Sequence, residues 1–286
     1  MKDQLCLHNY RYILAALQLA CCEYIRFFIK SWCLGKRLIV DMPDIFERRT
    51  LSLYDSEYAT QYANVDSQLI GTEDFSFSCN FIRTAGNYSM QCPSRGGDKS
   101  NRRVAIDFGC GTGRYFECFE RFSTLLACDI SESMLAHARD KCEVLAGRYK
   151  LNVLLIRAGM ELLDQLMPNS VNFVSSIGVL GEHYPLDVLF LKKVSRILVN
   201  GGVCAFTVVD ADSIAKQNSM KRRLYERFSR STGIRIDRFH CLHLQSTELA
   251  SVVEHSGLDT VQSLSRFHHG HQWRGSHFFV ILRKPG

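Results

Sequence analysis

The sequence predicts an α/β protein in which a mostly parallel β-sheet carries helices on both faces. Three observations predict this fold. From residue 104 onward, apolar runs typical of buried strands alternate with segments typical of helices. Glycines at every second position follow the first apolar run, as in a tight turn that leaves a strand. Near the end of the chain two strands follow one another without a helix, which predicts an antiparallel last strand.

The strands are predicted from short apolar runs, and the helices from apolar residues at helical spacing and from capping residues. Ser131 is expected to cap one helix and Ser246 another, which ends at Gly257. The expected strands lie near 104–108, 124–129, 152–157, 171–177, 202–209, 259–264 and 277–283. The expected helices lie near 112–121, 132–148, 161–166, 186–198 and 246–257.

The 286 residues are expected to form two parts. Residues 1–100 are predicted to be a helical N-terminal extension or lid, which ends in a polar linker rich in Gly, Ser, Lys and Arg. Residues 101–286 are predicted to be the sheet domain. After the fifth strand, residues 211–245 are typical of a basic helix followed by a strand, so we expect a cap insertion there.

The turn after the first strand has the composition of a binding site for a nucleoside. Asp107 ends the strand, and Gly109, Gly111 and Gly113 follow it. Glycine lacks a Cβ atom, so its backbone adopts positive φ and lets a ligand lie against it. Asp129 ends the next strand, where a carboxylate can accept hydrogen bonds from both ribose hydroxyls. The G-x-G-x-G spacing differs from the G-x-G-x-x-G of dinucleotide-binding turns.

These motifs resemble those of the class I S-adenosylmethionine-dependent methyltransferases, and the chain is similar to the small-molecule type that acts on quinones and natural products. The resemblance is carried, in the family's order, by residues 107–113, 129–131, 158–161, 175–180 and 198–202, and it covers roughly 100–285. It implies a Rossmann-like, seven-stranded, mostly parallel sheet with an antiparallel last strand. It also implies S-adenosyl-L-methionine as the cofactor.

The same resemblance assigns roles to individual residues. It implies that Asp107 orders the turn or binds the cofactor's ammonium, and that Asp129 binds the ribose. Gly159 stands where many relatives carry an acid for the adenine amine, so Met160 or Glu161 is expected to make that contact. Relatives often use a tyrosine from the segment ahead of the sheet to close over the cofactor, and this chain has tyrosines there at 54, 58 and 62. The predicted cofactor-binding residues are Tyr58, Asp107, Gly109, Cys110, Gly111, Gly113, Asp129, Ile130, Met134, Met160, Glu161, Ser176 and Ile177.

Two residues after the fourth strand are predicted to be catalytic. Methyl transfer is an in-line displacement, so the enzyme mainly aligns and desolvates the reactants. A base is needed where the acceptor is a hydroxyl or a protonated amine. In this fold Glu182 and His183 lie where donor and acceptor should meet, and a neutral imidazole could be that base. The alternative is that both residues only order the loop ahead of the next helix.

The function predicted from the sequence is S-adenosylmethionine-dependent transfer of a methyl group to O or N of a small molecule. One alternative is an RNA methyltransferase, but the fourth strand ends in SSIGVLG rather than N/D-P-P-Y/F. No Pro-Cys nucleophile pair or RNA-binding module is visible either, which argues against a nucleic-acid partner. A second alternative is a regulator that binds S-adenosylmethionine without turnover. No metal site is predicted, because the histidines lack i, i+4 spacing and a supporting acid cluster.

Composition sets the remaining expectations. Twelve cysteines without a C-x-x-C pair favour a reducing, cytoplasmic location. The net charge of +6 permits acidic ligands without requiring nucleic acid. Charged residues interrupt the apolar stretch near the N-terminus, so it contains no uncharged span of 18 residues. Apolar residues recur at helical spacing from 14 to 28, which predicts an amphipathic helix there. That helix either packs over the sheet domain, lies on a membrane surface or forms a dimer contact, and the sequence leaves the oligomeric state open.

Overall fold

The computed structural model describes residues 50–51, 54–91, 103–211, 243–268 and 275–286. All of these belong to the compact unit that starts at residue 43. The predicted amphipathic helix, most of the polar linker and most of the expected cap insertion lie outside the described residues. Among the described helices, none combines the length and the apolar composition needed to cross a membrane.

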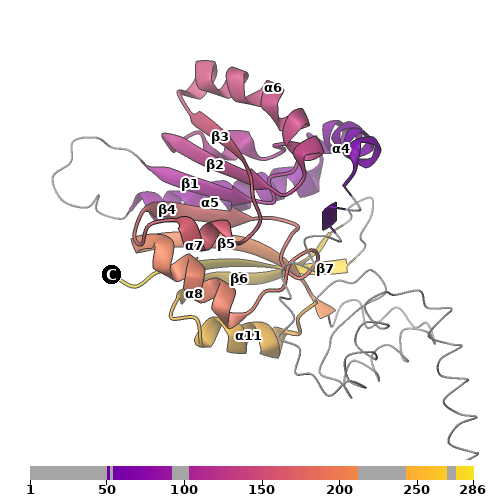
Figure 1. Cartoon of the computed structure of the whole chain (residues 1–286). Helices are drawn as coiled ribbons and strands as arrows, with labels where there is room; N and C mark the ends of the chain where they lie inside the picture. Colours follow the sequence, from indigo (N-terminus) through magenta and orange to yellow (C-terminus); the bar gives the residue numbers. More distant parts are fainter. Residues whose placement is uncertain (1–49, 52–53, 92–102, 212–242, 269–274) are drawn as a thin grey trace, which may run out of the picture. The chain divides into compact units, whose positions relative to one another are not determined.

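A single seven-stranded sheet forms the centre of this unit (Figure 1). Its strands run in the order β3 (Asn152–Arg157), β2 (Thr124–Asp129), β1 (Val104–Phe108), β4 (Val171–Ser176), β5 (Leu198–Val209), β7 (Gly275–Arg283) and β6 (Asp259–His268). Neighbouring strands from β3 to β5 are parallel. β7 is antiparallel to both of its neighbours. The predicted fold class, including the antiparallel last strand, is confirmed.

Helices cover both faces of the sheet (Figure 1). One face packs against α5 (Glu73–Met90), the 3₁₀ helix η1 (Phe116–Phe119) and α6 (Glu132–Tyr149). The other face packs against α7 (Leu162–Gln165), α8 (Val188–Ile197) and α11 (Ser246–Glu254). A further helix, α4 (Ser56–Leu69), lies against α6.

The strand residues alternate between these two apolar layers. In β1, Ala105 belongs to the layer with α5 and α6, whereas Ile106 and Phe108 belong to the layer with α8. All three side chains are at most 1% exposed. A strand that is buried on both faces has a continuous apolar sequence. For this reason the strand predicted near 104–108 agrees with the observed bounds of β1.

The helix expected near 112–121 is not formed. A turn is present instead, followed by the short 3₁₀ helix η1. Gly111 and Gly113 have φ values of 53° and 74°, and such left-handed residues cannot continue an α-helix. Ser131 caps α6 as predicted, by accepting a hydrogen bond from the Met134 amide. The cap of α11 is Gln245 rather than Ser246, because Gln245 and Glu248 form a reciprocal capping box.

The core on the α5 side generates a prediction for stability. Phe173 in β4 is fully buried, and its ring stacks on Phe122 with centroids 5.5 Å apart. We expect Phe173→Ala to lower the free energy of unfolding by about 3–5 kcal/mol, measured by denaturant titration. Leu154→Ala is the control, because Leu154 lies on the edge strand β3 and is 44% exposed. The free energy of unfolding of Leu154→Ala should fall by less than about 1 kcal/mol. An equal decrease in Leu154→Ala and Phe173→Ala would contradict the placement of Phe173 in the core.

Candidate functional site

A pocket opens where the carboxyl ends of β1, β2, β3 and β4 meet, the usual place for ligands in open α/β sheets. The space between its walls, open solvent at its mouth included, is about 710 Å³. The lining residues come from the strand ends and from the segment ahead of the sheet. They are Thr50, Tyr54, Tyr62, Phe108, Gly109, Gly111, Asp129, Ile130, Met134, Ala158, Gly159, Met160, Ile177, Gly178, Val179, His183 and Tyr184.

The three glycines of the turn after β1 all have positive φ, but their surroundings differ. A Cβ atom on Gly109 would come within 2.2 Å of Val179, and one on Gly113 within 2.6 Å of the Phe116 ring. A Cβ atom on Gly111 would meet no atom within 4 Å. Gly109 and Gly113 therefore allow close packing inside the protein, whereas Gly111 leaves free space on the pocket wall for a ligand.

Asp129 at the end of β2 joins the glycine turn to the next loop. Its Oδ2 atom accepts a hydrogen bond from the Gly111 amide, and Oδ1 accepts one from the Ser131 amide, both at 2.9 Å. Burial raises the pKa of Asp129, while these two backbone donors oppose that rise. A carboxylate has about four lone-pair sites, so Asp129 retains acceptor capacity toward the pocket that it lines.

Asp107 is placed differently. It is 3% exposed, does not line the pocket and lies beside its register partner Ser175 in β4. Burial raises the pKa of Asp107 to about 7, and the charge of Asp129 adds to the rise, whereas the neighbouring Ser175 side chain opposes it. This position fits the predicted role in ordering the turn better than direct contact with a ligand.

The structure separates the two residues predicted to be catalytic. His183 lines the pocket, and its Nε2 atom lies 3.0 Å from the Tyr54 hydroxyl. Burial lowers the pKa of His183, although Glu182 and Asp129 oppose the change. Glu182 does not line the pocket, because its Oε1 atom lies 3.3 Å from Nε2 of His277 in β7. His183 thus lines the pocket with its neutral form favoured, and Glu182 belongs to a buried pair with His277.

The pocket brings together about half of the predicted cofactor-binding residues. Those that line it are Gly109, Gly111, Asp129, Ile130, Met134, Met160 and Ile177. Those that do not are Tyr58, Asp107, Cys110, Gly113, Glu161 and Ser176. For two of these the reason is a local hydrogen bond: the Ser176 hydroxyl donates to the Phe108 carbonyl, and Glu161 accepts from the Gly159 amide. Their contact with a cofactor stays a prediction.

Sequence reasoning assigned no role in the site to several residues that line the pocket, among them Thr50 and Tyr184. Tyr54 and Tyr62 were singled out only as members of a stripe with Tyr58 at a spacing of four. The structure starts α4 at Ser56, so Tyr58 and Tyr62 share one helical face while Tyr54 precedes the helix and packs its ring against both. Tyr54 reaches His183 from outside the helix, which the spacing could not indicate.

Residues 106–206 match the family model for a methyltransferase domain. This stretch is therefore similar to methyltransferase domains. It runs from β1 into β5 and contains the glycine turn, Asp129 and His183. No protein of curated function matches the chain significantly.

Solved structures share the fold of the methyltransferase domain at low sequence identity. An S-adenosylmethionine-dependent methyltransferase from Clostridium acetobutylicum is 14% identical with a TM-score of 0.52, covering 79% of this chain and 99% of that one. One from Methanosarcina mazei is 15% identical with a TM-score of 0.52, covering 65% and 94%. Magnesium protoporphyrin IX methyltransferase from Synechocystis, with bound S-adenosylmethionine, is 12% identical with a TM-score of 0.51, covering 87% and 100%. The chain thus has the class I methyltransferase fold.

The buried carboxyl of Asp107 predicts a pH dependence of the methyltransferase domain's stability. Its pKa of about 7 in the folded protein exceeds the ordinary 3.8, so the folded state holds a proton that the unfolded state releases between these values. Stability therefore falls as pH rises from about 4 to 7. Asp107→Asn should remove this fall and raise the free energy of unfolding at pH 8 by up to about 4 kcal/mol.

The measurement is denaturant titration of both proteins at several pH values. Asp164→Asn is the control, because that side chain is 55% exposed on the surface. It should leave the pH dependence of the wild type in place. An unchanged slope between pH 4 and 7 in Asp107→Asn would contradict the assignment.

Proposed function

We propose that this protein transfers a methyl group from S-adenosyl-L-methionine to an oxygen or nitrogen atom of a small-molecule acceptor. The observation that carries the proposal is the composition of one pocket. The unfilled space at Gly111 and the carboxylate of Asp129 lie in the same pocket as the pair Tyr54–His183. The first two suit a nucleoside, and the pair suits proton removal from an acceptor.

The pocket residues fit the ribose and the adenine of the proposed cofactor. Asp129 has lone pairs left for the ribose hydroxyls, and Gly111 lets the ligand lie against the backbone. The side chains of Ile130, Met134 and Met160 offer an apolar surface for adenine. When bound, the sulfonium of this cofactor supplies the methyl group and a neutral thioether leaving group.

His183 is proposed to accept the proton that the acceptor loses. Burial lowers the pKa of His183, so the ring is neutral at pH 7, and burial raises the pKa of Tyr54, so its hydroxyl keeps its proton. Tyr54 can then donate to Nε2 of His183 across 3.0 Å. In this arrangement the acceptor's proton passes to the Tyr54 oxygen while the Tyr54 proton passes to His183.

Cofactor binding gives the first test. We expect Gly111→Ala to weaken binding of S-adenosylmethionine about tenfold or more, because the new methyl group occupies ligand space. Isothermal titration calorimetry measures the affinity. Gly257→Ala is the matched control, because Gly257 also has positive φ and open space around it but does not line the pocket. A wild-type protein that binds no S-adenosylmethionine would refute the proposed function.

Turnover gives the second test, with acceptors found in a methyl-transfer screen. We expect His183→Ala to lower kcat by about 10²–10⁴-fold and to change the cofactor's affinity little. The wild-type kcat should fall only below pH 6.5, because burial lowers the pKa of His183. His255→Ala, at an exposed histidine after α11, is the control. Equal loss of turnover and affinity in His183→Ala would leave His183 with a loop-ordering role alone.

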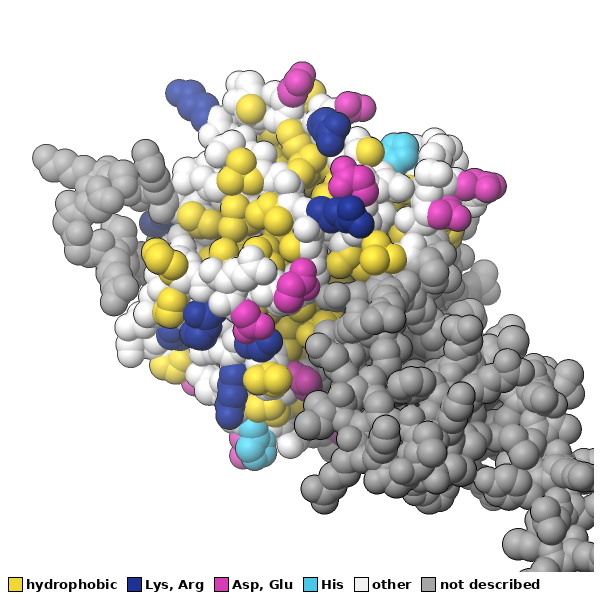
Figure 2. Space-filling view, viewed as in Figure 1, with side chains coloured by type: hydrophobic (Ala, Val, Ile, Leu, Met, Phe, Trp, Pro, Cys, Tyr) yellow, Lys and Arg dark blue, Asp and Glu magenta, His cyan; other side chains and the backbone are white. Residues whose placement is uncertain are grey.

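Two further features support the choice of acceptor and compartment. On the face shown in Figure 2, acidic and basic side chains are interspersed over the described residues instead of gathering into one basic patch. This supports a small-molecule acceptor over a nucleic acid. The six cysteines in the described part of the chain are free thiols, which supports the proposed cytoplasmic location.

A further inference from the structure

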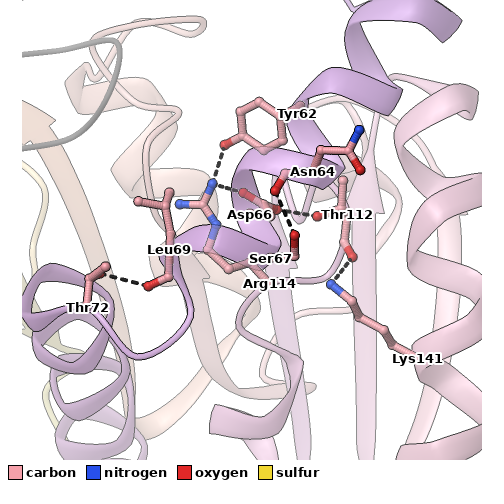
Figure 3. A network of polar contacts seen from close by, with 9 residues as sticks. All are labelled: Tyr62, Asn64, Asp66, Ser67, Leu69, Thr72, Thr112, Arg114 and Lys141. Carbon is pink, nitrogen blue, oxygen red and sulfur yellow. Dashed lines mark hydrogen bonds and ion pairs between the residues drawn. The ribbon is translucent and has the colours of Figure 1, made fainter.

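A buried ion pair connects α4 to the glycine turn (Figure 3). Asp66 on α4 accepts hydrogen bonds from the Thr112 hydroxyl and from the Arg114 guanidinium. The Asp66 side chain is 4% exposed and that of Arg114 is 18% exposed. A carboxylate buried this deeply is stable only when it is paired, so Asp66 keeps α4 and the turn together.

Arg114 also holds part of the pocket wall. Its Nη2 atom donates a hydrogen bond to the Tyr62 hydroxyl at 3.0 Å, as Figure 3 shows. The guanidinium lies over the rings of Tyr62 and Tyr115, at 5.3 Å and 5.6 Å from their centroids. Because Tyr62 lines the pocket, one cation fixes both the buried carboxylate and the wall of the site.

The glycine turn itself is held from other sides as well. Lys141 on α6 donates to the Thr112 carbonyl at 2.8 Å (Figure 3). On the pocket side, the Gly111 amide donates to Asp129. The turn therefore stays in place without α4, and of the two partners α4 is the one that can move.

The packing of α4 supports this. Its only buried residues are Ala59 and Asp66, whereas α5 buries seven residues, most of them apolar. An element with so little apolar burial opens at low free energy. Polar contacts, with the Asp66–Arg114 pair the most buried of them, therefore carry much of the attachment of α4.

We propose that Asp66 and Arg114 form a latch that keeps α4 closed against the pocket, and that opening of this latch limits the release of the demethylated cofactor. The inference rests on the proposed function, because it concerns the occupant of the same pocket. Closure holds the Tyr62 side chain, and with it one wall of the pocket, in place. Asp66 and Arg114 are thus positioning residues, since neither lines the pocket.

The test uses Arg114→Met, Asp66→Asn and the double variant of the full chain. The rate of S-adenosylhomocysteine release is measured by stopped-flow displacement, and the opening of α4 by hydrogen exchange of residues 56–69 without ligand. Each single variant should release the ligand about tenfold faster and exchange α4 amides faster, with β1 amides unchanged. The double variant should release it no faster than the singles, because both changes break one pair.

Controls separate a latch from a merely structural contact. Lys193→Met breaks the partly exposed pair Lys193–Asp164 between α8 and α7 and should change neither readout. Arg114→Lys retains the charge, so it should release the ligand more slowly than Arg114→Met. If Arg114→Met does not fold, Asp66→Asn is the variant that breaks the pair.

The outcomes are distinguishable. A wild-type protein that binds neither S-adenosylmethionine nor S-adenosylhomocysteine refutes the proposed function, and hydrogen exchange then still decides whether the pair holds α4. Normal binding with an unchanged release rate in both single variants overturns the latch alone. Unchanged exchange of α4 also overturns it, as does a double variant whose effect is the product of the two singles.

Discussion

The hydrogen bond from the Gly111 amide to the Asp129 carboxylate is the contact on which the site depends. It links the turn after β1 to the end of β2, so the two strand ends form one surface. Gly111 donates this bond from left-handed backbone with a φ of 53°, which L side chains rarely adopt. The same conformation breaks the helix expected there and leaves the space beside Gly111 open. One backbone requirement thus explains the turn, the missing helix and the pocket.

The electrostatics of the pocket depend on the positions of two acidic residues, Asp107 at the end of β1 and Asp129 at the end of β2. Backbone donors that include the Gly111 and Ser131 amides favour the charged form of Asp129, whereas Asp107 lies deeper, where burial disfavours its charged form. The neighbouring His183 is kept neutral by burial. A cationic ligand beside Asp129 would find an acceptor on one side and an uncharged base on the other. That pattern is the one an in-line transfer from a sulfonium needs.

The features of the fold and of the site that could be predicted from the sequence are those that depend on local sequence pattern. The positions of the strands along the chain followed from apolar runs, because strands such as β1 are buried on both sides. Asp129 and Gly111 could be assigned because the motif spans a fixed distance along the chain. Tyr54 and Glu182 could not be placed in the same way. Their positions depend on contacts across 129 and 95 residues, with His183 and His277, and no local spacing encodes such contacts.

Because α4 buries few residues, stability and pocket shape depend on different parts of this molecule. The sheet and its apolar layers provide most of the stability of the protein. The segment ahead of the sheet contributes Thr50, Tyr54 and Tyr62 to the pocket and adds little to the packing of the core. A substitution at Thr50 can therefore reshape the cavity while leaving the sheet, the Tyr54–His183 pair and the Arg114–Tyr62 contact in place. We therefore expect a change of acceptor specificity to arise from substitutions in this leading segment more readily than from substitutions in the strands.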